Sequence, residues 1–101
     1  MEQTISGTVY AIEGIQALSV GFKQVVTLLQ PEIERDGRVL YKEEYFQIQI
    51  WSKEQTDKRF LSFNDKHTER KAVCYLKGER WMSKHSNEFA YALKLNLKNW
   101  I

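Results

Sequence analysis

The sequence predicts an all-β domain in which five short strands curl into a small barrel, with one short helix after the third strand. Apolar and polar residues alternate along five separate segments, which is the period of a strand. A strong tight-turn signal, Asp36-Gly37, lies between two of these segments. Gly7, inside the first, indicates a bend or a close backbone approach, as where strands curl toward a barrel. The 101 residues can enclose one core but not two, so we expect a single domain, residues 1–101.

The first strand is predicted at residues 4–12, and a loop at residues 13–21 leads to the second, at residues 22–30. The second strand is rich in Val, Thr, Leu and Phe, which favour strands. Pro31 ends it, because proline has no backbone N–H to donate to a neighbouring strand. We expect the second and third strands to be antiparallel neighbours joined by a ribbon that turns at Asp36-Gly37.

The third strand, residues 44–52, carries the predicted site. Its alternation separates an aliphatic face, suited to closing a core, from a second face with an aromatic ring near each end and two amides between them. Large rings are unusual on a surface left to water, so we interpret the second face as a binding surface. The alternative is that its rings pack against a loop or a neighbouring subunit. The aliphatic face is formed by Phe46, Ile48 and Ile50, and the second face by Tyr45, Gln47, Gln49 and Trp51.

The period then changes, and residues 56–64 predict a short helix. Thr56 or Asp57 is suited to cap its start, and Asn64 lies near its end. We expect its apolar side chains to plug one end of the sheet. These side chains are Phe60, Leu61 and Phe63.

The fourth strand is predicted at residues 71–77, broken by Gly78, with residues 79–83 continuing as one arm of a hairpin. A turn at residues 85–88 leads to the fifth strand, residues 89–97. Five short strands that share one buried face, with a helix between the third and fourth, fit a five-stranded barrel of the OB type. Closure would also remove the exposed edges of an open sheet.

The charge balance is too small to indicate a polyanion partner by itself, since the net charge is +2. Its distribution is more informative. Residues 66–84 hold six basic side chains against two acidic ones, whereas residues 31–44 hold five acidic against three basic. Such a polarity is commonly just a solvated face, so it favours a binding function only together with other signals.

The compartment is expected to be the cytoplasm. No apolar run approaches the roughly 20 residues that span a bilayer, and the first residues lack the basic and apolar regions of a signal peptide. The single cysteine, Cys74, alternates with Ala72 and Leu76 on a predicted strand. We therefore expect a buried structural thiol rather than a nucleophile.

Catalytic and metal-binding patterns are not found in the sequence. There is no glycine-rich phosphate loop, and His67 and His85 lie in predicted loops without metal-ligand spacing. The carboxylates of residues 32–44 flank an exposed turn, where solvation opposes acid-base tuning. We predict no enzyme, no metal and no cofactor.

Binding of single-stranded nucleic acid is better supported, because it requires aromatic rings for stacking beside cations that follow the phosphates. Trp81 lies among basic residues on a predicted hairpin arm, although it could also anchor a subunit contact. Trp100 is interpreted as a structural anchor of the last strand. The candidate stacking residues are Tyr45, Trp51 and Trp81, and the candidate cations are Lys23, Lys53, Lys77, Arg80 and Lys84.

These residues resemble the bacterial single-stranded DNA-binding proteins and the small OB-fold proteins of Bacteroides-type bacteria. The runs from Glu44 to Lys53 and from Ala72 to Arg80 look like the family's third and fourth strands, and the run from Ile5 to Val9 resembles its first. The resemblance implies binding of single-stranded DNA without sequence preference, with RNA left open, by a homodimer or homotetramer. By position it implies stacking at Tyr45 and Trp51 and phosphate contact near Arg80, while the family's further stacking tryptophan falls nearer His85 than Trp81.

An alternative is a protein-interaction or structural OB domain similar to primosomal replication protein N, without nucleic acid as its main ligand. That relative begins with a run comparable to Ser6-Gly7-Thr8-Val9. The modest net charge favours this alternative, as does a sequence that stops at Trp100-Ile101 without the family's acidic tail.

Overall fold

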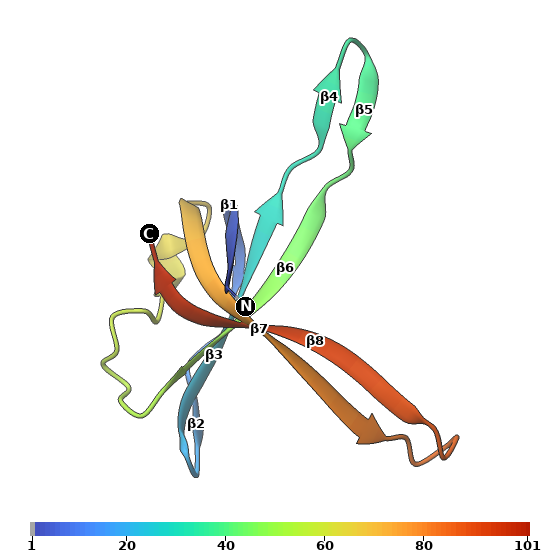
Figure 1. Cartoon of the computed structure of the whole chain (residues 1–101). Coiled ribbons are helices and arrows are strands. Elements are labelled where there is room, and N and C mark those ends of the chain that lie inside the picture. Colours follow the sequence, from blue (N-terminus) through green and yellow to red (C-terminus); the bar gives the residue numbers. More distant parts are fainter. Residues whose placement is uncertain (1) are drawn as a thin grey trace.

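The computed structural model describes residues 2–101, and its fold is all-β (Figure 1). Every predicted strand is present. A short strand, β2, lies within the segment predicted as a loop, because residues 16–18 pair with the start of β3. The elements are β1 (Glu2–Ile12), β2 (Gln16–Leu18), β3 (Gly21–Gln30), β4 (Ile33–Arg35), β5 (Arg38–Tyr41), β6 (Glu44–Ser52), the 3-10 turn η1 (Phe63–Asp65), β7 (Glu69–Met82) and β8 (Phe89–Trp100).

Five of the strands form a ring in the order β1, β7, β8, β6, β3 and back to β1. All neighbours are antiparallel except β6 and β8, which run parallel with Ile48 beside Leu95. The ring curls where β1 leaves β7 and joins β3. At that point a Cβ on Gly7 would lie 2.8 Å from the backbone oxygen of Leu29. The close backbone approach predicted at this glycine is therefore confirmed.

The core fills the inside of the ring, and each of the five strands contributes to it. The predicted alternation of β6 is confirmed, because Ile48 and Ile50 are buried and Phe46 packs against them. Cys74 is also buried, and burial raises the pKa of its thiol to about 11, as expected of a structural cysteine. The buried residues are Ile5, Val9, Val26, Leu28, Ile48, Ile50, Leu61, Ala72, Cys74 and Leu97.

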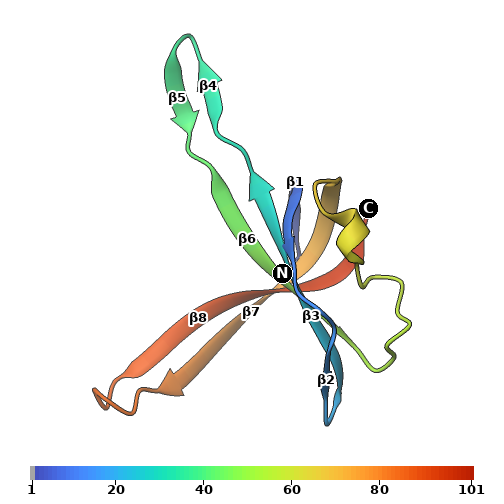
Figure 2. The same ribbon diagram turned by 180° about the vertical axis from the view of Figure 1, so that it is seen from behind.

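Two hairpins project from the ring in different directions (Figures 1 and 2). The β4–β5 ribbon turns at Asp36 and Gly37, which both have positive φ, so the predicted hairpin is confirmed. The β7–β8 arm, which comprises residues 76–82 and 89–94, extends beyond the pairing of β7 with β1. The predicted break at Gly78 is wrong. The Gly78 backbone lies outside the left-handed region and pairs with Leu93, so β7 continues through this residue.

The helix predicted at residues 56–64 is also wrong. Residues 56–62 are loop and turns, and the only helical turn among the described residues is η1, which includes just the last two residues of the predicted helix. The reason is the buried Gln24 side chain, whose Nε2 donates to the Leu61 oxygen at 2.8 Å and whose Oε1 accepts from the Leu61 N–H at 2.8 Å. These bonds take the backbone groups that a helix would use. Phe60 and Leu61 still pack on the core, whereas Phe63 is exposed.

Candidate nucleic-acid interface

The outer face of β6 presents both predicted aromatic rings to solvent. Tyr45 is 48% exposed and Trp51 41% exposed, with Gln47 and Gln49 between them. They lie outside the ring of strands because the residues that alternate with them fill the core. The face is therefore accessible to a ligand at both ends.

A lysine lies over the ring at the Trp51 end. Lys23 of β3 is the cross-strand partner of Trp51, and its Nζ lies 5.1 Å from the ring centroid. The indole Nε1 of Trp51 donates to Gln49 Oε1 at 3.2 Å. Lys23 forms no ion pair within the described residues. Its charge is thus available to an anionic group beside an exposed indole.

The Tyr45 end has a different setting. Tyr10 of β1 packs edge to face on Tyr45, with 5.0 Å between ring centroids and 73° between planes. The Tyr45 hydroxyl donates to Glu43 Oε1 at 3.4 Å. Partial desolvation, followed by the Glu43 carboxylate, raises the pKa of Tyr45 above its ordinary value. This end thus combines a neutral phenol with an acidic neighbour.

Strands β7 and β8 extend this outer face. The parallel pairing of β6 and β8 places Asn96 beside Gln49, and the pairing of β8 with β7 places Tyr75 beside Asn96. Lys98 Nζ lies 5.8 Å from the Tyr75 ring centroid and donates to Glu2 Oε1 at 2.7 Å. Sequence reasoning did not select Tyr75, Asn96 or Lys98. Alternation along β8 could have placed its polar residues opposite its leucines, but it could not show which strand lies beside them.

The base of the β7–β8 arm adds further cations to the same side. Lys77 pairs across the arm with Lys94, and Glu79 receives ion pairs from Lys94 at 3.0 Å and from Lys77 at 3.8 Å. The hydrogen bond from Lys94, with weaker attraction from Lys77 and Lys23, lowers the pKa of Glu79. Because the charge of Lys23 contributes to lowering the Glu79 pKa, this side of the arm lies within electrostatic range of the Trp51 end.

The remaining predicted residues are distributed over several places. Trp81 is half exposed and lies on the same side of β7 as Lys77. Arg80 lies on the opposite side, with its guanidinium carbon 4.2 Å from the Phe89 ring centroid. Lys53 is exposed in the loop after β6, and Lys84 is exposed in the hairpin tip. Lys23 contacts Trp51 at one end of β6, whereas Lys77 and Trp81 lie on the arm, on the side of β7 opposite to Arg80.

Arg59 fixes the Trp51 end of β6 through a hydrogen bond to the backbone of this strand. Its guanidinium donates to the backbone oxygens of Trp51 and Leu97 and forms an ion pair of 2.9 Å with Asp57. Trp100 Nε1 donates to the Arg59 backbone oxygen at 2.8 Å, which confirms Trp100 as a structural anchor. The Arg59 hydrogen bonds lower the pKa of Asp57 well below its ordinary value. This cluster ties the end of β6 to the end of β8.

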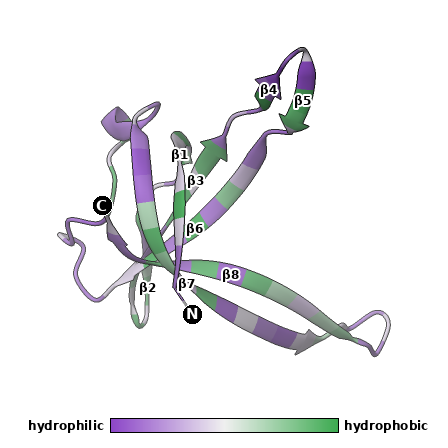
Figure 3. Ribbon diagram, turned by 45° about the horizontal axis from the view of Figure 1, so that its top comes forward, coloured by the Kyte–Doolittle hydropathy of each residue, from purple (hydrophilic) through white to green (hydrophobic). Residues whose placement is uncertain are grey.

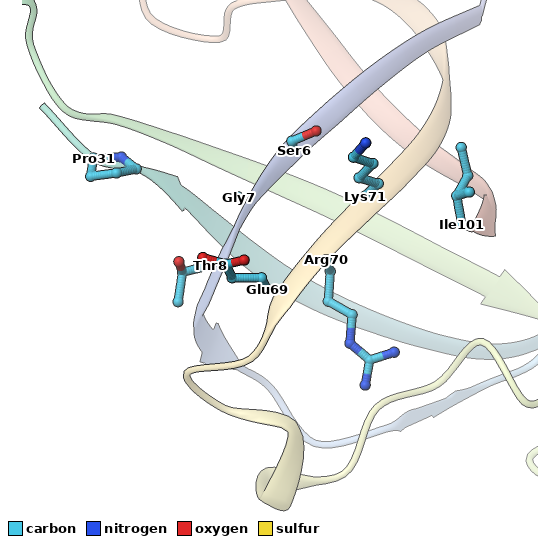
Figure 4. A pocket seen from close by; sticks show the side chains of 8 residues that line it. All are labelled: Ser6, Gly7, Thr8, Pro31, Glu69, Arg70, Lys71 and Ile101. Atoms are coloured by element: carbon cyan, nitrogen blue, oxygen red, sulfur yellow. The ribbon is translucent and has the colours of Figure 1, made fainter. Parts of the chain in front are cut away.

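A shallow pocket lies elsewhere, between β1 and β7 (Figure 4). Figure 4 shows Glu69 beside Thr8, and Lys71 and Arg70 extending in opposite directions. Arg70 is paired with Asp65 at 2.9 Å. The charges that line this pocket are mixed, and the pocket lacks an exposed aromatic ring. It is therefore a weaker candidate for a binding site than the face around Trp51. Residues 2–101 hold no cluster of His, Cys, Asp and Glu suited to a metal ion, and no helix among them is long and apolar enough to cross a bilayer.

Comparison with models of known protein families gives no match for this chain, and comparison with curated proteins gives none either.

Proposed function

We propose that the five-stranded ring is a barrel of the OB type that binds single-stranded DNA without sequence preference. The strand order supports this fold, since the first three ring strands, β1, β3 and β6, are consecutive antiparallel neighbours and the last, β8, returns beside β6. OB folds bind oligonucleotides on the face of their second and third strands, which correspond here to β3 and β6. That face carries Trp51 and Lys23.

The observation that carries the proposal is the exposed Trp51 ring with Lys23 over it. Base stacking on an aromatic side chain contributes about 1–3 kcal/mol per base and does not depend on sequence, because every base has a π-face. An ammonium group beside the ring can neutralise the phosphate that accompanies the stacked base. Lys77 and Trp81 supply a second cation and a second ring on the outer side of the β7–β8 arm. The bound DNA would therefore run from Trp51 toward this arm.

The test is a titration of tryptophan fluorescence with oligo-dT at low salt. We expect quenching, and an affinity that falls as salt rises with a log–log slope of about −0.7 for each neutralised phosphate. Parallel titrations with oligo-rU and with duplex DNA distinguish the ligand classes. Duplex should bind more weakly, because its stacked bases cannot reach the Trp51 ring. An unchanged fluorescence signal and an unchanged anisotropy of labelled oligo-dT at low salt would reject the proposal.

A second candidate function is a protein-interaction domain without nucleic acid as its main ligand. The acidic setting of Tyr45 favours it, because Glu43 opposes the approach of a phosphate to that ring. If oligo-dT leaves the protein unchanged in the titration above, this candidate takes precedence.

A further inference from the structure

One side of the β7–β8 arm is apolar and uncovered in the described chain. Cross-strand pairing places Gly78 with Leu93, Arg80 with Tyr91 and Met82 with Phe89 on the same side as the buried pair Cys74 and Leu97. The arm thus carries the core-facing side of the sheet outward into solvent, and Figure 3 shows hydrophobic residues continuing along β8 away from the ring. The exposed apolar side chains there are Leu76, Met82, Phe89, Tyr91 and Leu93.

Gly78 in the middle of this side has no structural reason within its own chain to be a glycine. A Cβ built on it meets no atom within 4 Å, and its φ lies outside the left-handed region. Gly7 differs, since its Cβ would collide with the Leu29 backbone. A glycine inside a strand weakens it and often marks a site where another group approaches closely. A depression lies at Gly78, and its other lining residues are Glu79, Arg80, Tyr91, Ala92 and Leu93.

A projecting side chain lies directly beside this depression. Leu93 is the cross-strand partner of Gly78 and is 78% exposed. A projection and a depression on the same cross-strand pair make the surface self-complementary. A two-fold axis that passes over this pair would place each copy's leucine in the other copy's depression, which is the geometry of an isologous contact.

We propose that two copies of this chain associate through the apolar side of the β7–β8 arm, with Leu93 of each copy seated over Gly78 of the other. The charge pattern suits this occupant. Arg80 is the one charged side chain on that side of the arm's described strands, and it lies over Phe89. Interface centres are depleted of charge and rich in aromatic residues. Lys77, Glu79 and Lys94 lie on the other side, so the contact leaves these charges and the Trp51 end open, while Leu93 borders a pocket with Tyr45 and Gln47.

Sedimentation velocity of the whole chain over a concentration series tests this interface. We expect a dimer for the wild type, and dissociation constants raised roughly 30-fold or more in Leu93→Glu and Gly78→Val, as for loss of an interface hot spot. Val39→Glu is the matched control, because it places the same charge at an exposed strand position of the other hairpin and should leave the dimer intact. A monomeric wild type at the highest concentration reached, or a Leu93→Glu dimer of unchanged strength, would overturn the proposal.

Folding of the variants is checked separately. Gly78→Val adds a β-branched side chain in open space, so its melting temperature should be equal to or above that of the Leu93→Glu monomer while the dimer is lost. As a second measurement, a mixture of the single variants Gly78→Cys and Leu93→Cys should form a disulfide between chains faster than either variant alone. Cys74 is buried and should not interfere. The test of the dimer can fail or succeed separately from the test of DNA binding, because a Leu93→Glu monomer retains Trp51 and Lys23.

Discussion

The two ends of strand β6 carry similarly exposed rings in opposite electrostatic settings. Trp51 lies under the Lys23 ammonium at 5.1 Å, whereas the Tyr45 hydroxyl is bonded to Glu43. Ring exposure is nearly equal at the two ends, so exposure alone does not separate a stacking site from a solvated ring. The neighbouring charge does, because a stacked base brings its phosphate with it. In the proposed function, base stacking is therefore expected mainly at the Trp51 end.

The difference follows from what each end is joined to. At the Trp51 end, β6 pairs with the start of β3 and is tied by Arg59 to the end of β8. At the Tyr45 end, β6 leaves the β4–β5 ribbon, whose surrounding residues 31–44 carry more acidic than basic side chains. The Trp51 end is thus held in the ring by hydrogen bonds from Arg59. The Tyr45 end instead lies where β6 emerges from the projecting acidic ribbon.

The largest effect is expected from removing the tie at the Trp51 end. Arg59→Ala should lower the free energy of unfolding by about 2–3 kcal/mol, since it removes charge-assisted hydrogen bonds to Asp57 and to two backbone oxygens. Tyr10→Phe, which keeps the ring against Tyr45, is the control at the other end and should change stability little. Urea denaturation measures both. Equal losses in the two variants would contradict the asymmetry.

Acid should weaken the ion pair between Arg59 and Asp57. The folded-state pKa of Asp57 is depressed, so its contribution to stability is present above its unfolded pKa, near 3.8, and is lost as the pH falls through lower values. Between pH 5 and pH 2 the wild type should lose about 1–2 kcal/mol more than Asp57→Asn, which lacks this titration. Urea denaturation at a series of pH values provides the comparison. Parallel pH curves for the two proteins would show that the Asp57 carboxylate contributes no such stability.

The charge over Trp51 should contribute a smaller amount to binding. Lys23→Gln should weaken oligo-dT binding about three- to tenfold and reduce the magnitude of the salt slope by about 0.7, the effect of one lost phosphate contact. Lys42→Gln removes the same charge next to the acidic ribbon and serves as the matched control. Fluorescence anisotropy at several salt concentrations measures both slopes. An effect of Lys42→Gln as large as that of Lys23→Gln would place the binding site elsewhere.

The smallest effect is expected at the Tyr45 end. Glu43→Gln removes the carboxylate beside the Tyr45 hydroxyl and should tighten oligo-dT binding about two- to threefold at low salt, because one repulsive charge is lost. It should also move the pKa of Tyr45 back toward its ordinary value, which an ultraviolet titration detects. Glu34→Gln, in the distant hairpin, is the control. Weaker binding by Glu43→Gln would mean that this carboxylate supports the ligand instead of opposing it.

Local patterns in the sequence predicted the strands, the turn and the two faces of β6. Period-2 alternation placed Ile48 inside and Trp51 outside without knowledge of any partner strand. The turn at Asp36-Gly37 needed only the tolerance of positive φ at these residues. These features depend on residues close together in the chain, so the sequence is sufficient to predict them.

Several features that depend on distant residues were not predicted. The expected helix at residues 56–64 is replaced by loop because Gln24, far away in the sequence, bonds to the Leu61 backbone. The parallel contact that brings Asn96 beside Gln49 is equally non-local. Arg80 and Trp81 are adjacent in the sequence, and alternation places them on opposite sides of the arm. A basic stretch in a sequence therefore overstates the charge that one face receives.

The central claim is that the Trp51 end binds the bases, and a comparison of Trp51→Ala with Tyr45→Ala in oligo-dT affinity tests it most directly. Trp51→Ala should weaken binding by about 1–3 kcal/mol, or roughly 5- to 150-fold, without loss of the fold. Tyr45→Ala should weaken it less than about threefold, because the Glu43 setting excludes a large stacking contribution there. Equal affinities of Trp51→Ala and the wild type, or a larger loss in Tyr45→Ala, would contradict the claim.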